Sequence, residues 1–380
     1  KINLDFNYLN YRSFFKIKAE TIDFEEIFFD INQQFENKNE IFGTGVLSTK
    51  DKKINLSGKL QSENLDFIQI TKLISQLRIY KNNNFYKANI GAPILNFNIG
   101  FSVDKVSFNE FEMTNFESKI FSKKENIIFD GLRAKHKDSL IKVDAIYFKN
   151  NKLIKGKMLI LDYMLKKNLI DKSEFYLDNA LFDCDIDFSL KNKKAEKKFL
   201  NNLLASGDCN APNSDLVGIN INKIISGIDN LETFQDFFDL FNKEKMKGIT
   251  KVDSINLKFD VKNSILNIIE MTAKQKNMKV RSTGSFKLYS EELDLINNIF
   301  VKTKKFKDLP NFDLIIRGTP KDYKITYNFD KIKSAVLSGG INSILKKKKK
   351  IVINPKSLKG LIDKESKKIN TEKLFDLFLD

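Results

Sequence analysis

The chain has 380 residues, of which 42% are apolar and 12% aromatic, with 34 Phe, 10 Tyr and no Trp. This length and apolar fraction permit a sizeable core and exclude global disorder. The formal net charge of +16 favours contact with polyanions such as nucleic acid, anionic lipid or acidic glycan, although lysines spread along the whole chain also fit a solvated polar face.

Apolar and polar residues alternate with a period of two through much of the chain, which is typical of strands with one buried and one wetted face. The segment 95–103 is the clearest case, because its apolar residues alternate with asparagine, glycine and serine. Val106 and Phe108 shift the parity, which predicts a turn or bulge near Asp104 and Lys105. The other expected strands lie at 2–8, 54–60, 182–190, 255–261, 278–288, 312–316 and 325–329.

Turn-forming residues separate these strands, for example at 149–152, 262–264 and 290–292. Because the connections are short, strands that follow one another in the sequence should pair as antiparallel hairpins. The sequence therefore predicts a mainly β fold with a few helices, built as an elongated antiparallel sheet of repeated strands rather than as a β-α-β alternation.

Helical spacing of apolar residues marks four further segments. The expected helices lie at 66–80, 195–204, 222–242 and 331–347, and Asp330 is a suitable N-cap for the last of them. Gly339 and Gly340 weaken the middle of that helix. A run of lysines at 346–350 and a short amphipathic end at 374–379 follow it.

The region from about 201 to 329 resembles the C-terminal part of AsmA-family proteins. One stretch comprises 204–208 and 216–225, where a strand rich in small residues precedes a turn that opens a helix; a second comprises 255–261 with 271–273. The third comprises 280–288, 293–295 and 312–320, similar to the family's double strand and its Gly-Thr-Pro strand end. Asn220 stands where the family usually has Asp, and Pro320 follows Thr319 directly, where the family often has a few residues between.

This resemblance implies a long curved sheet folded into a trough, similar to bridge-like lipid-transfer proteins. It also implies a periplasmic protein of a Gram-negative bacterium, supporting outer-membrane biogenesis and held in the inner membrane by an N-terminal anchor that we expect to precede Lys1. We expect three regions: a repetitive sheet at 1–190, an AsmA-like part at 191–345, and a lysine-rich tail at 346–380.

The expected function is non-enzymatic binding or transfer of phospholipid, or of another acyl lipid, on the apolar strand faces. The expected lining consists of Phe97, Ile99, Phe101, Val103, Ile255, Leu257, Phe259, Val261, Val280, Phe286, Leu288, Leu314, Ile316, Tyr327 and Phe329. The run of Lys346, Lys347, Lys348, Lys349 and Lys350 is expected to contact anionic headgroups. Strand periodicity by itself fits a closed apolar core equally well.

The residue types needed for catalysis are scarce, and we expect no cofactor and no metal. His136 is the one histidine and is expected at the surface among lysines, which leaves nucleophilic catalysis with one poorly placed base. Cys184 and Cys209 lack metal-ligand spacing, and the sequence leaves open whether they pair. The triplet at 183, 185 and 187 puts three aspartates on one strand face, most simply a solvated one.

Two other classes of function compete with lipid binding. A structural or assembly factor for outer-membrane proteins would pair its sheet edges with strands of client or envelope partner proteins. A nucleic-acid-binding protein would show clustered arginine and exposed stacking aromatics, and the basic residues here are mostly lysine. We therefore expect no nucleic-acid partner.

Overall fold

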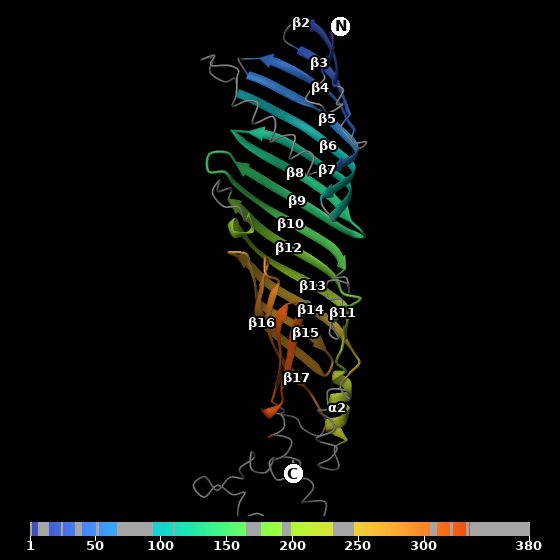
Figure 1. Cartoon of the computed structure of the whole chain (residues 1–380), viewed down its shortest axis with the longest axis vertical. Coiled ribbons are helices and arrows are strands. Elements are labelled where there is room, and N and C mark those ends of the chain that lie inside the picture. The colour runs from blue at the N-terminus through green and yellow to red at the C-terminus, as the bar shows by residue number, and fades with distance from the viewer. Residues whose placement is uncertain are drawn as a thin grey trace, which may run out of the picture.

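The computed structural model describes residues 2–6, 15–23, 26–34, 40–50, 53–66, 94–108, 111–164, 176–191, 199–230, 247–304, 310–319, 322–331 and 334. These residues form one elongated, curved sheet with β1 near one end and the helix α2 (Ile221–Asp229) near the other (Figure 1). The expected elongated sheet is confirmed, and it continues without a break past residue 190, where we expected the second region to begin.

Nineteen strands make up the described sheet. They are β1 (Ile2–Phe6), β2 (Phe15–Asp23), β3 (Glu26–Gln34), β4 (Glu40–Lys50), β5 (Lys53–Asp66), β6 (Ile94–Phe108), β7 (Phe111–Lys123), β8 (Asn126–His136), β9 (Ser139–Phe148), β10 (Leu153–Met164), β11 (Tyr176–Asp178), β12 (Leu181–Lys191), β13 (Leu203–Val217), β14 (Ile249–Lys262), β15 (Ile265–Gln275), β16 (Met278–Lys287), β17 (Glu292–Val301), β18 (Phe312–Thr319) and β19 (Asp322–Asn328).

Strands that are neighbours in the sequence are, with two exceptions, hydrogen-bonded neighbours in the sheet. The short strand β11 pairs with the end of β13 beside β12, so that β10 pairs directly with β12. The pair β5–β6 is parallel, which corrects the expectation of a fully antiparallel sheet. A parallel pair needs a long crossover rather than a hairpin, and the connection between these two strands spans 67–93. This segment lies outside the described residues, as does most of the helix expected at 66–80.

The described residues test the expected helices only in part. The predicted helix at 222–242 is α2, which ends at Asp229, and residues 231–246 are not described. The predicted helix at 195–204 is wrong at its end, because 199–202 form one 3₁₀ turn, η3 (Phe199–Asn202), and Leu203 already starts β13. Most of 331–347 and all of 346–380 lie outside the described residues.

Register carried from strand to strand places the apolar side chains on one face of the sheet, which we call the apolar face. It is the face of Cys184 and Cys209, and the opposite face is called the outer face. Cys209 is directly opposite Leu257 of β14, and Leu257 is directly opposite Met271 of β15. The same face continues over the strands that follow. In the other direction Cys184 is directly opposite Ile160 of β10. The outer face carries most of the aspartates, lysines and asparagines of the same strands.

Left-handed residues keep the apolar face continuous where the alternation breaks. Asn115, Gly131, Asp162 and Asn213 have φ between 50° and 60°, and the residue-by-residue pairing is interrupted at each of them. Glycine, asparagine and aspartate tolerate this conformation. At Asn115, Gly131 and Asp162 the strand has one extra residue relative to a neighbouring strand, which returns the next side chain to the apolar face. At Asn213 the register is the same on both sides of the interruption. In β6, Asp104 and Lys105 lie within the strand, and Val103 and Val106 are both buried, as the predicted parity shift requires.

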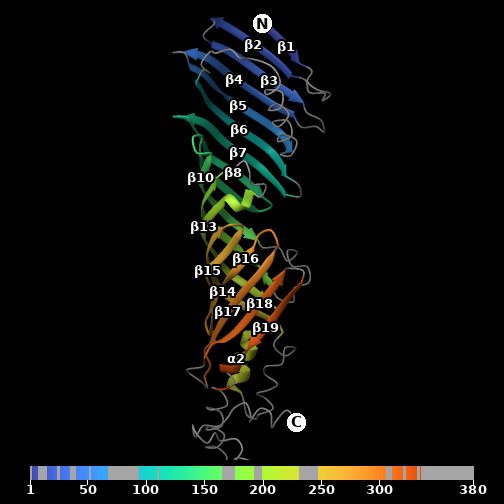
Figure 2. The same cartoon turned by 60° about the vertical axis from the view of Figure 1, so that its left-hand side comes forward.

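At its C-terminal end the sheet curls around α2 and closes into a core (Figure 2). The helix is capped by Asn220, whose Oδ1 accepts a hydrogen bond from Lys223 N at 3.0 Å. Thr250 of β14 fixes the start of the helix, because its Oγ1 accepts from Ile221 N at 2.9 Å and donates to Ile219 O at 2.6 Å. The side chains of Ile221, Ile224 and Ile228 are 0% exposed and share a cluster with residues of β12 to β18.

We predict that Ile224→Ala lowers the free energy of unfolding by about 2–5 kcal/mol, because it leaves a cavity under α2. Ile249→Ala is the matched control, since Ile249 stands at the nearby start of β14 and is 52% exposed. It should change stability by less than about 1 kcal/mol. Urea unfolding followed by circular dichroism measures both, and equal losses would contradict a packed helix.

Candidate functional site

The residues expected to line a lipid site all belong to the apolar face or to its core. Those of β6, β14, β16, β18 and β19 share the face by register, while Leu288 and Phe329 follow directly after β16 and β19 and pack in the C-terminal cluster. The lysines 346–350 expected to contact headgroups lie outside the described residues.

Burial divides the expected lining into two groups. Val103, Ile255, Phe259, Val261, Val280, Leu314 and Phe329 are between 1% and 7% exposed and are core residues. Phe97, Ile99, Phe101, Leu257, Phe286, Leu288, Ile316 and Tyr327 are half-buried. A surface that can receive a ligand must be accessible, so the half-buried group is the candidate site and the buried group supports it.

A long accessible stretch of the apolar face lies in described strands where the sequence predicted no site residue. It runs across β7 to β12, and its half-buried members are Ile120, Ile127, Phe129, Ile141, Val143, Tyr147, Ile154, Met158, Ile160, Phe188 and Leu190. The small side chains of Ala134 and Ala145 are buried there, as are Phe182 and Ile186 of β12, which belong to the C-terminal core. The alternation in 141–147 and 182–190 was the available signal, but alternation does not tell an accessible face from a core.

Phenylalanine rings on the apolar face lie across glycines of the neighbouring strand. Phe188 is paired with Gly156, and a Cβ atom added at Gly156 would lie 2.8 Å from Phe188 Cζ. The same relation holds for Phe259 and Gly207, at 2.9 Å. A ring that occupies the space above a glycine lies along the sheet instead of projecting from it. The apolar face is therefore shallow in relief, with few protrusions to obstruct an elongated ligand.

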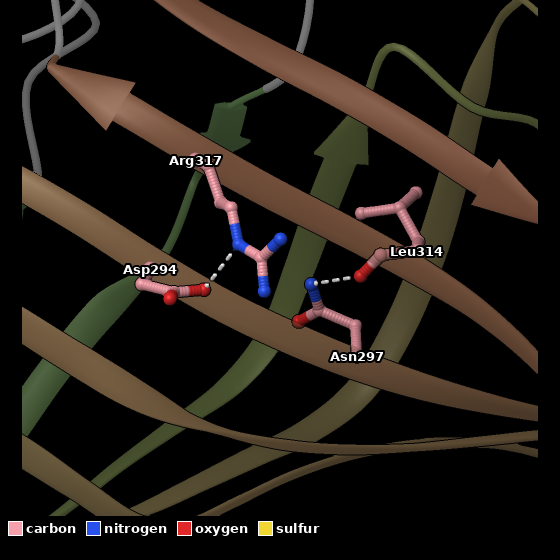
Figure 3. Close-up of polar contacts among 4 residues, drawn as sticks. All are labelled: Asp294, Asn297, Leu314 and Arg317. Atoms are coloured by element: carbon pink, nitrogen blue, oxygen red, sulfur yellow. Dashed lines mark hydrogen bonds and ion pairs between the residues drawn. The ribbon is translucent and has the colours of Figure 1, made fainter.

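Several polar groups buried in the C-terminal core are hydrogen-bonded within the sheet, although Ser214 Oγ has no hydrogen-bond partner among the described residues. Ser282 Oγ donates to Asn297 Oδ1 at 2.6 Å. Asn297 Nδ2 in turn donates to Leu314 O at 2.9 Å (Figure 3). On the outer face of β17 and β18, Arg317 Nε contacts Asp294 Oδ1 at 3.0 Å. Because their partners lie within the sheet, these groups stabilise the core and leave little polarity to recognise a ligand there.

Exposed ion pairs cross the outer face between neighbouring strands. Lys157 lies 3.6 Å from Asp187, and Lys258 lies 3.7 Å from Asp208. The Lys287 ammonium, by hydrogen bonding and then by charge, holds the pKa of the Glu292 carboxyl below its usual value. A groove of about 690 Å³ runs over this face across β8 to β13, lined by Ile128, Ile146 and Leu204 among charged residues. Its mixed charges point to no single ligand.

The one histidine is buried rather than exposed, which corrects the expectation of a surface residue. His136 is 9% exposed, and its ring stacks on Phe111 at a centroid distance of 4.2 Å. Its Nδ1 lies 2.7 Å from Glu112 O and donates to it, because a carbonyl oxygen only accepts. These two contacts give His136 a structural role where the end of β8 lies beside the start of β7.

A disulfide joins Cys184 of β12 to Cys209 of β13, which settles the pairing that the sequence left open. The two residues are directly opposite one another in the register, and Cys209 is 7% exposed. The bond lies on the apolar face at the boundary between the accessible stretch and the C-terminal core. It ties together the strands on which both parts depend.

We predict that the double variant Cys184→Ala/Cys209→Ala lowers the free energy of unfolding by about 3 kcal/mol, from the loss of a cross-link that closes a 25-residue loop. Dithiothreitol should lower the stability of the natural chain by a similar amount and leave the variant unchanged. Guanidinium unfolding with and without the reductant measures this. An equal effect of the reductant on both proteins would show that the thiols are unpaired.

Comparison of the chain with protein-family models, with curated proteins and with solved structures gave no match. No helix among the described residues is both long and apolar enough to cross a membrane. Within the same residues, no cluster of three or more histidine, cysteine or acidic side chains is arranged to hold a metal ion. Asp183 instead accepts a hydrogen bond from Asp162 N, and Asp187 forms an ion pair with Lys157.

Proposed function

We propose that the chain binds acyl lipid on the accessible part of its apolar face and carries it without catalysis. The observation that supports this most directly is the continuous row of large, half-buried apolar side chains from β6 to β12. No second sheet packs over this row among the described elements. A soluble protein seldom leaves so long an apolar surface without a ligand or partner.

The energetics suit lipid better than a polar ligand. Each methylene moved from water to an apolar surface contributes about 0.8 kcal/mol, so two acyl chains are held by area alone. The face offers few unsatisfied polar groups to a sugar or nucleotide, since side chains such as Ser282 and Asn297 already have partners. The shallow relief produced by the ring–glycine pairs allows a chain to lie across several strands.

The setting we propose is the periplasm of a Gram-negative bacterium, with an anchor in the inner membrane and a role in outer-membrane biogenesis. The resemblance of 201–329 to the AsmA family motivates this, and the chain is proposed as a relative of that family. The disulfide between Cys184 and Cys209 supports an oxidising compartment. Asn220, which replaces the family's usual Asp, is equally suited to its position as the N-cap of α2.

The proposal predicts that Phe129→Asp sharply reduces bound lipid, whereas Ile128→Asp does not. The two residues are neighbours in β8 and are both half-buried, but Phe129 lies on the apolar face and Ile128 on the outer face. A carboxylate on the apolar face opposes the burial of an acyl chain. Native mass spectrometry of each purified full chain, followed by lipid extraction, measures the occupancy.

Both variants must show the same unfolding midpoint for the comparison to hold, because each adds one charge to the same strand. Equal lipid occupancy in folded variants would remove the apolar face as the binding surface. A natural chain that retains no lipid, under conditions in which a known lipid carrier stays loaded, would refute the proposal as a whole.

The open ends of the sheet favour a second candidate function. Among the described strands β1 and β19 each have only one partner, so that an edge is available for pairing with a strand of another protein. A structural or assembly factor for outer-membrane proteins would use such an edge. Site-specific crosslinks from β19 to client strands, together with an absence of lipid, would favour this function over lipid binding.

A further inference from the structure

The two long margins of the accessible apolar stretch differ in charge. Along one margin the β7–β8 and β9–β10 turns and the end of β12 carry five lysines and one glutamate, and we call these lysines the basic rim. The basic rim consists of Lys123, Lys124, Lys149, Lys152 and Lys191, and all five are exposed. Along the other margin stand four aspartates, Asp138, Asp162, Asp178 and Asp183, and among the described residues of β8 to β12 the lysines beside them are Lys135 and Lys137.

The strand register brings the lysines of the basic rim together along one margin of the sheet, where the strands end. Leu153, directly after Lys152, pairs with Lys191 on one side and with Phe148, directly before Lys149, on the other. The β7–β8 turn lies on the same margin, two strands away, at a distance of about 10 Å by the usual spacing of strands. The five lysines therefore form one positive patch.

The described part of the protein does not neutralise the charge of this patch. None of the five lysines forms an ion pair with another described residue, in contrast to Lys157, Lys258 and Arg317 on the outer face. Glu125 is the single acidic residue in the two turns. A surface of this kind attracts an anion that brings its own negative charge.

The basic rim borders the apolar face directly. The last apolar row beneath it consists of Ile127, Tyr147, Ile154 and Leu190, which are paired in that order across β8, β9, β10 and β12 and are all half-buried. A ligand that spans both features has an apolar portion and an anionic portion next to it. This is the chemistry of an anionic phospholipid and not that of a nucleic acid, which would call for exposed stacking aromatics or arginine beside the patch.

We propose that the basic rim binds the headgroup of an anionic phospholipid whose acyl chains lie on the adjoining apolar face, so that the protein selects acidic over zwitterionic lipid. This inference rests on the proposed lipid-binding function and adds the headgroup class and its position. The acidic margin strengthens the selection, because it repels an anionic headgroup from the opposite side. Lipid therefore lies in one orientation across the sheet.

The test compares lipid taken up by the full chain from vesicles of phosphatidylcholine mixed with phosphatidylglycerol. The rim variant carries Lys123→Gln, Lys124→Gln, Lys149→Gln and Lys152→Gln. The control variant carries Lys274→Gln, Lys276→Gln, Lys302→Gln and Lys304→Gln, four exposed lysines on the opposite margin of the C-terminal strands. Both variants lose the same net charge. Once both are shown to unfold at the same midpoint, the extracted lipid is quantified by mass spectrometry.

We expect the natural chain and the control variant to prefer phosphatidylglycerol to phosphatidylcholine. In the rim variant the ratio of the two bound lipids should fall at least about fivefold, because one lysine at an anionic surface already contributes that much. Raising the salt concentration should weaken the preference in the natural chain.

Two results would overturn the headgroup inference while leaving lipid binding intact: uptake without headgroup preference, or a preference that survives in the rim variant. Rim-dependent binding of a DNA oligonucleotide without phosphatidylglycerol uptake would assign the patch to a polyanion and overturn it as well. No uptake of either lipid would instead refute the proposed function on which the inference rests.

Discussion

The structure depends on the pairing of each strand with the next at a register that keeps the apolar side chains on one face. Because side chains alternate with a period of two, a slip of one residue anywhere would send the following apolar residues to the wetted face. The chain prevents this at the irregular points with one extra residue in a left-handed conformation, as at Asn115, Gly131 and Asp162. Each returns the next side chain to the apolar face, which is why that face extends over so many strands.

The apolar face is buried in one part of the molecule and accessible in another. At the C-terminal end it is buried around α2, where Ile224 and Ile228 fill the space between strands of the curled sheet. Between β6 and β12 many of its large apolar side chains remain half-buried, and among the described elements neither a helix nor a second sheet packs over them. The closed end supplies stability through its core, while the open stretch offers surface. The disulfide of Cys184 and Cys209 stands at the transition between the two.

Charge and apolar surface are arranged together rather than independently. The charged groups of the outer face form ion pairs within the sheet. The lysines of the β7–β8 and β9–β10 turns, which stand beside an apolar row, form no ion pair with any described residue. A ligand with one apolar and one anionic part would engage both features at once. The proposed lipid function and the proposed headgroup preference thus concern one surface, divided by chemistry into a face and its margin.

The sequence by itself determined the strand pattern, the turns at 149–152, 262–264 and 290–292, and the alternation of apolar residues, because a period of two is a local property of the backbone. It also placed a helix after residue 220, where the structure has α2 (Ile221–Asp229). Only the tertiary structure decided that β5 and β6 are parallel, that Cys184 lies opposite Cys209, and that His136 is buried against Phe111. It alone separated Phe259, which is core, from Phe101, which is accessible, and gathered the lysines of the basic rim. Burial and margin charge depend on the curvature of the sheet and on which segments become neighbours, and no local pattern of residues encodes these.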